Sequence, residues 1–456
     1  MPIARTYGFG LILICFGVFL ALQSPVMAFA QINSEVSVFN DSFISSAFQA
    51  ADKSNFQFIG TQFKSAPNST DSFKMDVAAG LAVGSPLLNY INVSELYFES
   101  NQGNGQAFYI GRKKFDWSAL DSRWNLGVFE PIFSWDPLTP SSQGLTGLFW
   151  QVEHPWWNIL VFASPFYIPD QGPSFEVENG SFVKGNPWFR TPPSDINIFG
   201  QTTQIDYQYD KPNDASVVMQ KSFGGKVGIG DTKDGLSAQA SYIYKPANQL
   251  AIGYNGTLDI PSDAGVVTLL PEVYYHSLTG LDIKYQASRS VRMGISSLYD
   301  HPSQEQVFDS QWTYPVFQDA VLVSPYIDWA SPIGIFSLQY LNISGGNVTE
   351  VGDLASNTRA ALSDPYPYRE AIQASFANKF YFGQNRILSS KLTYTISQLN
   401  KFSMIRLESR LHLSKIWSFF IDGQLVDAAP ETFSNQNIIA EYANNDQLMI
   451  GVAYAF

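Results

Sequence analysis

Apolar and polar residues alternate one by one in several segments of the chain. In 388–397 most even positions are apolar, and Ser, Lys and Thr hold the odd ones. In 405–413 four apolar residues hold odd positions, and between them stand Arg406, Glu408, Arg410 and His412. A period of two is typical of β-strands, whose successive side chains point to opposite faces. Runs of about ten residues match the length of a tilted strand that crosses a bilayer.

Further alternating segments predict strands along most of the chain. They lie near 55–64, 72–83, 90–100, 106–114, 144–152, 157–165, 235–245, 281–287, 333–343, 369–380 and 417–425. Gaps rich in Pro, Gly and Asn separate them at 115–143, 167–195, 300–319, 345–367 and 427–445. Strand counts made from the two ends of the chain disagree by one between about residues 196 and 330. Single-chain bacterial barrels normally have an even number of strands, so one segment there is misread. The chain length suggests about 18 strands and the segment count about 20, so we expect 16–20.

Composition favours strands that cross a membrane over a soluble sandwich. Aromatic and charged residues each make up 15% of the chain, and the mean hydropathy is −0.06. A large barrel with lipid outside and water inside needs aromatic outer faces and charged inner faces. Beyond the N-terminal run, no stretch approaches the roughly eighteen apolar residues of a transmembrane helix. The sequence predicts an all-β fold: one transmembrane antiparallel β-barrel over 31–456, with long outer loops and short periplasmic turns.

The first thirty residues have the features of a secretory signal peptide. Arg5 precedes an apolar run from about Phe9 to Leu22, and Ala28-Phe29-Ala30 forms a cleavage site. We expect the segment 1–30 to be removed on export, and the alternative is an uncleaved membrane anchor. The only cysteine, Cys15, lies inside the apolar run, so the cleaved chain would contain no disulfide and no cysteine-based site.

Two stretches resemble known outer-membrane proteins. The chain ends in an alternating strand in which Gly451, Tyr454 and Phe456 resemble the assembly signal of bacterial outer-membrane proteins. In 90–150, the stretches Glu95-Leu96-Tyr97-Phe98-Glu99 and Tyr109-Ile110-Gly111-Arg112, followed by a Trp-containing loop, resemble a hairpin of porins. The chain is thus similar to bacterial outer-membrane β-barrel proteins of the porin type. The resemblance implies a Gram-negative outer-membrane location, with lipopolysaccharide, periplasmic chaperones and the barrel-assembly machinery as partners, and an oligomer is possible.

The charged faces of the strands supply the candidate pore lining. Arg or Lys facing lipid at the midplane costs about 2–4 kcal/mol, so these faces should point inward. The candidates are Lys379, Lys391, Arg406, Glu408, Arg410, His412, Glu95 and Glu99. Lys and Arg on the inward faces of three consecutive strands predict a basic patch on one wall.

The long loop after Arg112 supplies the candidate constriction. It carries Asp116, Asp121, Glu130 and Asp136. Folded into the lumen, the loop would set its carboxylates against the basic wall, and opposed charges in a narrow opening create a transverse field. Folded outward, it would leave the basic residues to solvate the lumen, and we favour this second arrangement.

Other chemistry has little support. No two of the four histidines lie at metal-ligand spacing, and no phosphate loop, dinucleotide motif or nucleophile elbow appears. The net charge of −13 disfavours nucleic acid. We expect no cofactor, no metal and no enzymatic activity, although a dispersed Ser–His–Asp site stays open. The leading hypothesis is a porin-like channel for passive diffusion of ions and small polar solutes. The alternatives are a substrate-specific outer-membrane transporter and a non-conducting structural or adhesive surface barrel.

Overall fold

A computed structural model describes most of the chain after the N-terminal segment. It covers residues 32–46, 48, 50–65, 72–198, 200–210, 213–231, 235–259, 264–303, 312–351, 365–383, 386–429 and 438–456. The expected signal peptide lies outside these residues. Among those described, no helix is long and apolar enough to cross a membrane.

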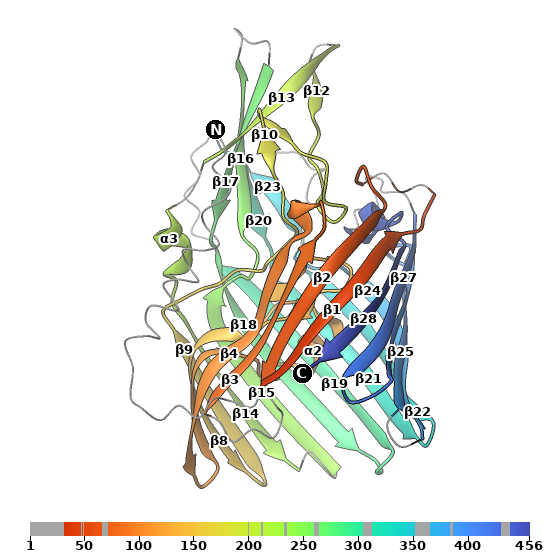
Figure 1. The fold of residues 1–456 in the computed structure, drawn as a ribbon. Coiled ribbons are helices and arrows are strands. Elements are labelled where there is room, and N and C mark those ends of the chain that lie inside the picture. Colours follow the sequence, from red (N-terminus) through yellow and green to blue (C-terminus); the bar gives the residue numbers. More distant parts are fainter. Residues whose placement is uncertain are drawn as a thin grey trace, which may run out of the picture.

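Eighteen antiparallel strands form a closed barrel (Figure 1). Each strand pairs with the next wall strand in the sequence, and the last strand pairs with the first, from Glu35 opposite Ala455 to Phe43 opposite Gln447. This confirms the predicted all-β fold, a single antiparallel β-barrel of 16–20 strands. In order round the wall, the strands are β1 (Ile32–Phe43), β2 (Asn55–Ser65), β3 (Phe73–Ala82), β4 (Tyr90–Gly103), β5 (Gln106–Lys113), β8 (Leu145–His154), β9 (Trp157–Ser164), β14 (Ser222–Gly230), β15 (Gly235–Pro246), β18 (Tyr275–Gln286), β19 (Val291–Ser303), β21 (Ala320–Ser331), β22 (Gly334–Gly345), β24 (Glu370–Phe382), β25 (Arg386–Ser397), β26 (Phe402–His412), β27 (Trp417–Ala428) and β28 (Gln447–Ala455).

The two ends of the barrel differ in their connections. At one end the strands join through turns of a few residues, such as 104–105, 155–156, 287–290, 332–333 and 413–416. At the other end lie the long connections 114–144, 165–221, 247–274, 304–319, 346–369 and 429–446. The described chain begins and ends at the short-turn end, because β1 and β28 both have their free ends there. This division into long loops and short turns confirms the prediction.

The stretch in which the strand counts disagreed holds wall strands that the sequence reading missed and extra strands above the wall. The hairpin of β16 (Ala251–Asp259) and β17 (Ala264–Glu272) joins β12 (Asp195–Ile198) and β13 (Gln201–Tyr209) in a four-stranded sheet that rises from the long-loop end (Figure 1). A strand pattern in the sequence is the same whether the strand lies in the wall or in a loop. The sequence reading gave no segment for β14, β19 and β21, and it also missed β1, which closes the ring.

The remaining elements are short and belong to the loops. They are the strands β6 (Ile132–Phe133), β7 (Ser141–Ser142), β10 (Val177–Glu178), β11 (Ser181–Phe182), β20 (Tyr314–Phe317) and β23 (Val348–Val351), and the helices η1 (Pro86–Leu88), α2 (Ala119–Trp124), α3 (Asp214–Val218) and η3 (Ile438–Tyr442).

Large apolar side chains are exposed on the outer face of the wall. On β26, Ile405 and Leu407 are 42% and 40% exposed, whereas Arg406 lies between them on the inner face and pairs with Glu408. Trp417 is exposed at the start of β27, and its ring meets that of Tyr454 at 4.9 Å. Exposed aromatic residues near a barrel end fit an interfacial girdle.

The lumen near the long loops is packed with apolar side chains. Phe58, Leu278 and Leu322 point inward from the wall and are fully buried, together with Trp117 and Trp188 from the loops. The loops therefore pack against the inner wall at the long-loop end.

Candidate functional site

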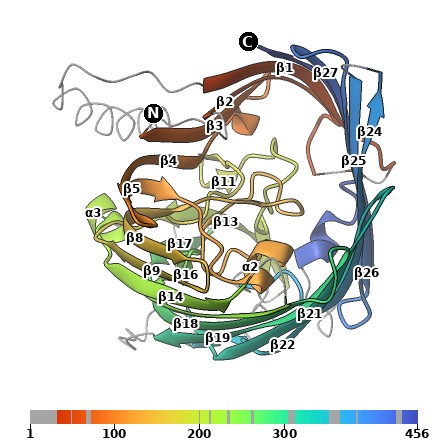
Figure 2. The same cartoon turned by 90° about the horizontal axis from the view of Figure 1, so that it is seen from below.

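The loop between β5 and β8, residues 114–144, folds into the barrel. Its helix α2 lies inside the ring of strands when the barrel is viewed along its axis (Figure 2). The Ser118 hydroxyl lies 3.1 Å from that of Ser296 on β19, and the Trp124 indole donates a hydrogen bond of 3.0 Å to the Ser324 hydroxyl on β21. The loop thus reaches wall strands more than 170 residues away in the sequence. The outward arrangement that the sequence favoured is wrong.

Helix α2 has its own start and stop signals. The Ser118 side chain accepts a hydrogen bond from the Leu120 amide at its first turn, as an N-cap residue does. The carboxylate of Asp282, from β18, accepts one from the Ala119 amide at 3.1 Å. Asn125 ends the helix in the left-handed conformation with φ of 48°. The wall therefore satisfies amides that a six-residue helix leaves unpaired.

Arginine and aspartate fasten the other end of α2. Arg123 forms an ion pair of 2.6 Å with Asp328 on β21, and Arg292 on β19 pairs with the same carboxylate at 2.7 Å. The Arg123 guanidinium also lies 3.5 Å above the Tyr326 ring. Because one carboxylate joins two wall strands to the loop, we call this set of Arg123, Arg292, Tyr326 and Asp328 the anchor.

Three of the four loop carboxylates are used within the loop. Asp121 accepts hydrogen bonds from the amides of residues 128 and 129, Glu130 accepts one from the Phe115 amide at 2.6 Å, and Asp136 accepts one from the Thr139 hydroxyl at 2.7 Å. Burial raises the pKa of Asp121, Glu130 and Asp136. Of the four candidates, only Asp116 is exposed. The loop therefore does not present a row of free carboxylates to the basic wall.

The predicted basic residues share the inner face of β24 to β26. Lys379 and Lys391 lie on β24 and β25, and Lys391 is in register with Glu408 on β26. Arg406 pairs with Glu408 at 2.9 Å, and Arg410 pairs with Glu35 on β1. His412 follows on the same face of β26, next to the turn. The structure thus brings these candidates together, and their role in lining the ion path remains a prediction.

Acidic residues lie on the opposite wall. In a ring of 18 strands, β4 lies across from β22, and β8 lies across from β25. Glu95 and Glu99 belong to β4 and Glu153 to β8. Glu95 accepts a hydrogen bond of 3.0 Å from the Lys114 amide, and Glu99 accepts one of 2.9 Å from Asn101. The acidic residues on the side opposite the basic wall therefore belong to other strands of the barrel and not to the loop 114–144.

The sequence reading missed a second basic group beside α2. Lys226 on β14 and Lys284 on β18 are placed on the inner face by their registers, as is Arg292 of the anchor. The Lys226 ammonium donates a hydrogen bond of 2.6 Å to the backbone carbonyl of Asp116. The sequence of β14 contains the pattern that predicts this position, because Lys226 holds an even position and the exposed residues Phe223, Val227 and Ile229 hold odd ones.

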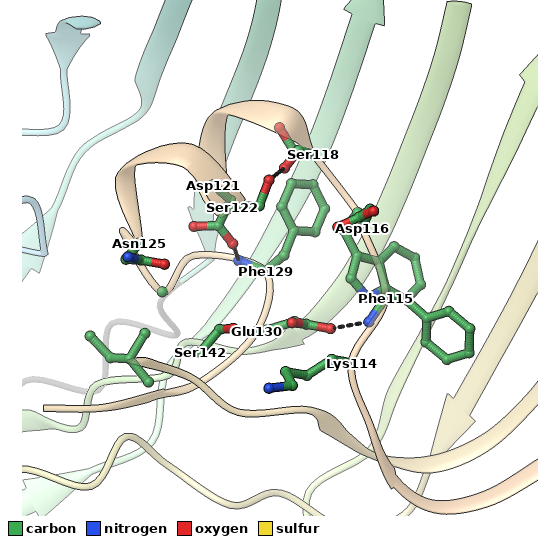
Figure 3. A pocket seen from close by; sticks show the side chains of 13 residues that line it. Lys114, Phe115, Asp116, Ser118, Asp121, Ser122, Asn125, Phe129, Glu130 and Ser142 are labelled. Carbon is green, nitrogen blue, oxygen red and sulfur yellow. Dashed lines mark hydrogen bonds between the residues drawn. The ribbon is translucent and has the colours of Figure 1, made fainter. Parts of the chain in front are cut away.

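A cavity of about 340 Å³ lies against the loop 114–144, which we call the inner loop (Figure 3). Its lining includes Lys114, Phe115, Asp116, Asn125 and Glu130. Figure 3 shows the Glu130 carboxylate between Ser142 and the Phe115 amide to which it is bonded. Over the described part of the chain, no group of three or more His, Cys, Asp or Glu residues is arranged to hold a metal ion.

The three candidate assembly residues lie at the seam of the barrel, where the last strand, β28, pairs with the first, β1. Gly451 lies in register between Phe39 of β1 and Phe420 of β27, and a Cβ there would lie 2.5 Å from the Cβ of Phe39. The Tyr454 ring stacks on that of Phe456 at 6.1 Å, and the Phe456 amide bonds the Ser34 carbonyl at 2.9 Å. Their role as an assembly signal stays a prediction.

No protein-family model matches the chain, and no curated protein matches it. Among solved structures, OccAB3 of Acinetobacter baumannii is 10% identical, with a TM-score of 0.44, over 93% of this chain and 99% of that one. OpdQ of Pseudomonas aeruginosa is 10% identical, with a TM-score of 0.43, over 94% and 96%. OmpT, an outer membrane protein of Vibrio cholerae, is 8% identical, with a TM-score of 0.38, over 94% and 97%.

Proposed function

We propose that this chain is a porin-like channel of the bacterial outer membrane, through which ions and small polar solutes diffuse passively. The observation that carries the proposal is a closed 18-stranded barrel with apolar side chains outside, charges of both signs inside and a loop that narrows the lumen. Lipid requires an apolar outer face, whereas a charged inner face is stable only in contact with water. A water-filled passage satisfies both requirements.

The charge distribution supports passage of polar solutes. Lys391 on β25 faces Glu153 on β8 across the ring, while Arg406 lies on the strand next to β25 and Glu99 lies on β4, two strands from β8. Charges of opposite sign on facing walls orient water and solute dipoles between them, and apolar molecules gain nothing from such a field. The proposal includes no catalytic step. It includes export through a signal peptide and contact with lipopolysaccharide, both of which follow from an outer-membrane location.

Planar-bilayer recording of the purified full-length protein tests the proposal. Folded protein, identified as the heat-modifiable species on unboiled gels, should insert and conduct stepwise in KCl without added ligand. Boiled protein and detergent alone are the controls. A folded, inserted barrel that carries no current would contradict the channel. Current that depends on one added solute would instead favour a substrate-specific transporter.

A further inference from the structure

A lysine of this barrel lies in a cage of aromatic rings. Lys113 ends β5, and its ammonium lies 4.1 Å from the ring centroid of Tyr97, 4.4 Å from that of Tyr109 and 5.2 Å from that of Phe115. It also donates a hydrogen bond of 2.9 Å to the Tyr97 hydroxyl. Cations within about 6 Å of a ring face are attracted by the quadrupole of the ring. Three rings thus act on one ammonium group.

The three rings form neighbouring walls that meet edge to face. Tyr97 and Tyr109 have centroids 5.9 Å apart and planes at 73°, and Tyr109 and Phe115 have values of 5.6 Å and 74°. Gly111 lies opposite Tyr97 with a φ of 125°, and a Cβ at this position would lie 2.8 Å from the Tyr97 Cα. Only glycine allows β5 to approach β4 so closely here. The backbone is therefore shaped to hold the cage.

Two carboxylates act on the ammonium inside the cage. Burial, the largest influence, disfavours the charged form of Lys113, and Glu95 and Glu99 oppose this effect electrostatically. Both glutamates belong to the acidic side of the lumen. Phe115 also lines the cavity beside the inner loop, so the cage borders on open space. An aromatic cage flanked by carboxylates is the arrangement that recognises alkylammonium groups.

We infer that the cage of Tyr97, Tyr109 and Phe115 is a binding site for small organic cations, and that Lys113 fills it as a built-in competitor. Its ammonium is carried on a flexible four-carbon stem, so the side chain can swing into the lumen and leave the cage to a guest. The inference rests on the proposed function only in that a guest arrives through the lumen. Binding itself does not require conduction.

Calorimetric titration of the folded, full-length protein in detergent micelles tests the inference. The probe is tetramethylammonium chloride, with NaCl at equal ionic strength as the blank. Replacing Lys113→Met should tighten binding by about tenfold, because the internal competitor is gone. Lys379→Met is the matched control, since it removes the same charge from the opposite side of the lumen and should leave affinity as in the wild type.

A second substitution separates the cage from general electrostatics. Adding Tyr97→Leu to Lys113→Met should abolish the gain, while the carboxylates remain in place. Lys113→Gln serves in the same way if the methionine variant does not fold. An equal gain in the Lys113 and Lys379 variants, or no gain in either, overturns the cage. Stepwise current without a gain in affinity would support the channel and contradict the cation site. A gain in affinity without current would contradict the channel and support the cation site.

Discussion

Replacing Asp328→Asn should release the tip of the inner loop. This carboxylate is the part of the anchor that joins β21 to Arg123 of α2 and to Arg292 of β19. Its side chain is 9% exposed and that of Arg123 is 17% exposed, so their ion pair is largely shielded from water. Asparagine keeps the shape of the side chain and one acceptor oxygen, but it removes the charge that balances two arginines.

The size of the effect follows from burial. Removing one partner of a buried ion pair costs about 3–5 kcal/mol, because a charge is left without compensation. The pair with Arg292 contributes less, roughly 0–1 kcal/mol, because that side chain is 50% exposed. The remaining amide oxygen still accepts a hydrogen bond from Arg123. We therefore expect the anchoring free energy to fall by about 2–3 kcal/mol, which raises the population of the released tip roughly 30- to 150-fold.

Hydrogen exchange of α2 measures this population. Amides of residues 119–124 should exchange faster by that factor in the Asp328→Asn protein, and single-channel current should show added fluctuations. Asp422→Asn is the control, because it removes the same charge from the inner face of β27, five strands round the wall from β21. If α2 exchanges at the wild-type rate in folded Asp328→Asn protein, the anchor does not hold the loop.

Three further predictions concern the seam, a loop acid and the basic wall. Gly451→Ala should lower stability by about 1–3 kcal/mol, seen as a lower urea midpoint, because the added methyl would lie 2.5 Å from the Phe39 Cβ. Asp170, in the loop 165–221, accepts a hydrogen bond from the Ile132 amide, and burial raises its pKa from 3.8 to about 7. The folded protein thus binds the extra proton, so protection of the Ile132 amide from exchange should fall from pH 4 to pH 7 in wild type but not in Asp170→Asn. Arg406→Glu with Arg410→Glu should shift the reversal potential towards cation selectivity, because two positive charges become negative and Glu408 and Glu35 lose their partners. The shift should be larger at low salt than at high salt, because salt screens these charges. Flat exchange profiles, an unchanged midpoint or an unchanged potential would each refute the corresponding assignment.

Local alternation was enough to place most of the wall. The segments expected near 55–64 and 106–114 correspond to β2 (Asn55–Ser65) and β5 (Gln106–Lys113), because lipid outside and water inside impose the same period on every wall strand. The same reasoning put Arg406 and Ile405 on opposite faces, as the structure has them. The number of wall strands between about residues 196 and 330 stayed ambiguous because the sequence reading missed β14, β19 and β21.

The direction of the inner loop depends on contacts that no local pattern reveals. Ser118 and Trp124 bind Ser296 and Ser324, and serine at an inner position of a strand is equally consistent with contact to water. Asp121 and Glu130 looked like free pore charges, but they accept amide hydrogen bonds within the loop. A carboxylate that folds a loop and one that faces an ion have the same sequence signature, since each is a single acidic residue in a loop and its partner is set by the fold.

Which charged strands lie opposite one another depends on how the strands close into a ring. Lys391 and Glu153 lie 238 positions apart in the sequence, and they face one another because β25 and β8 are separated by half of an 18-stranded ring. A ring with one hairpin more or fewer would shift this opposition by about one strand, although every strand kept its own pattern. Strand number therefore helps to decide which charges face each other in the lumen. The transverse arrangement is set jointly by inner-face charges, which the sequence shows, and by β1, which the sequence reading missed and which completes the ring through its pairing with β28.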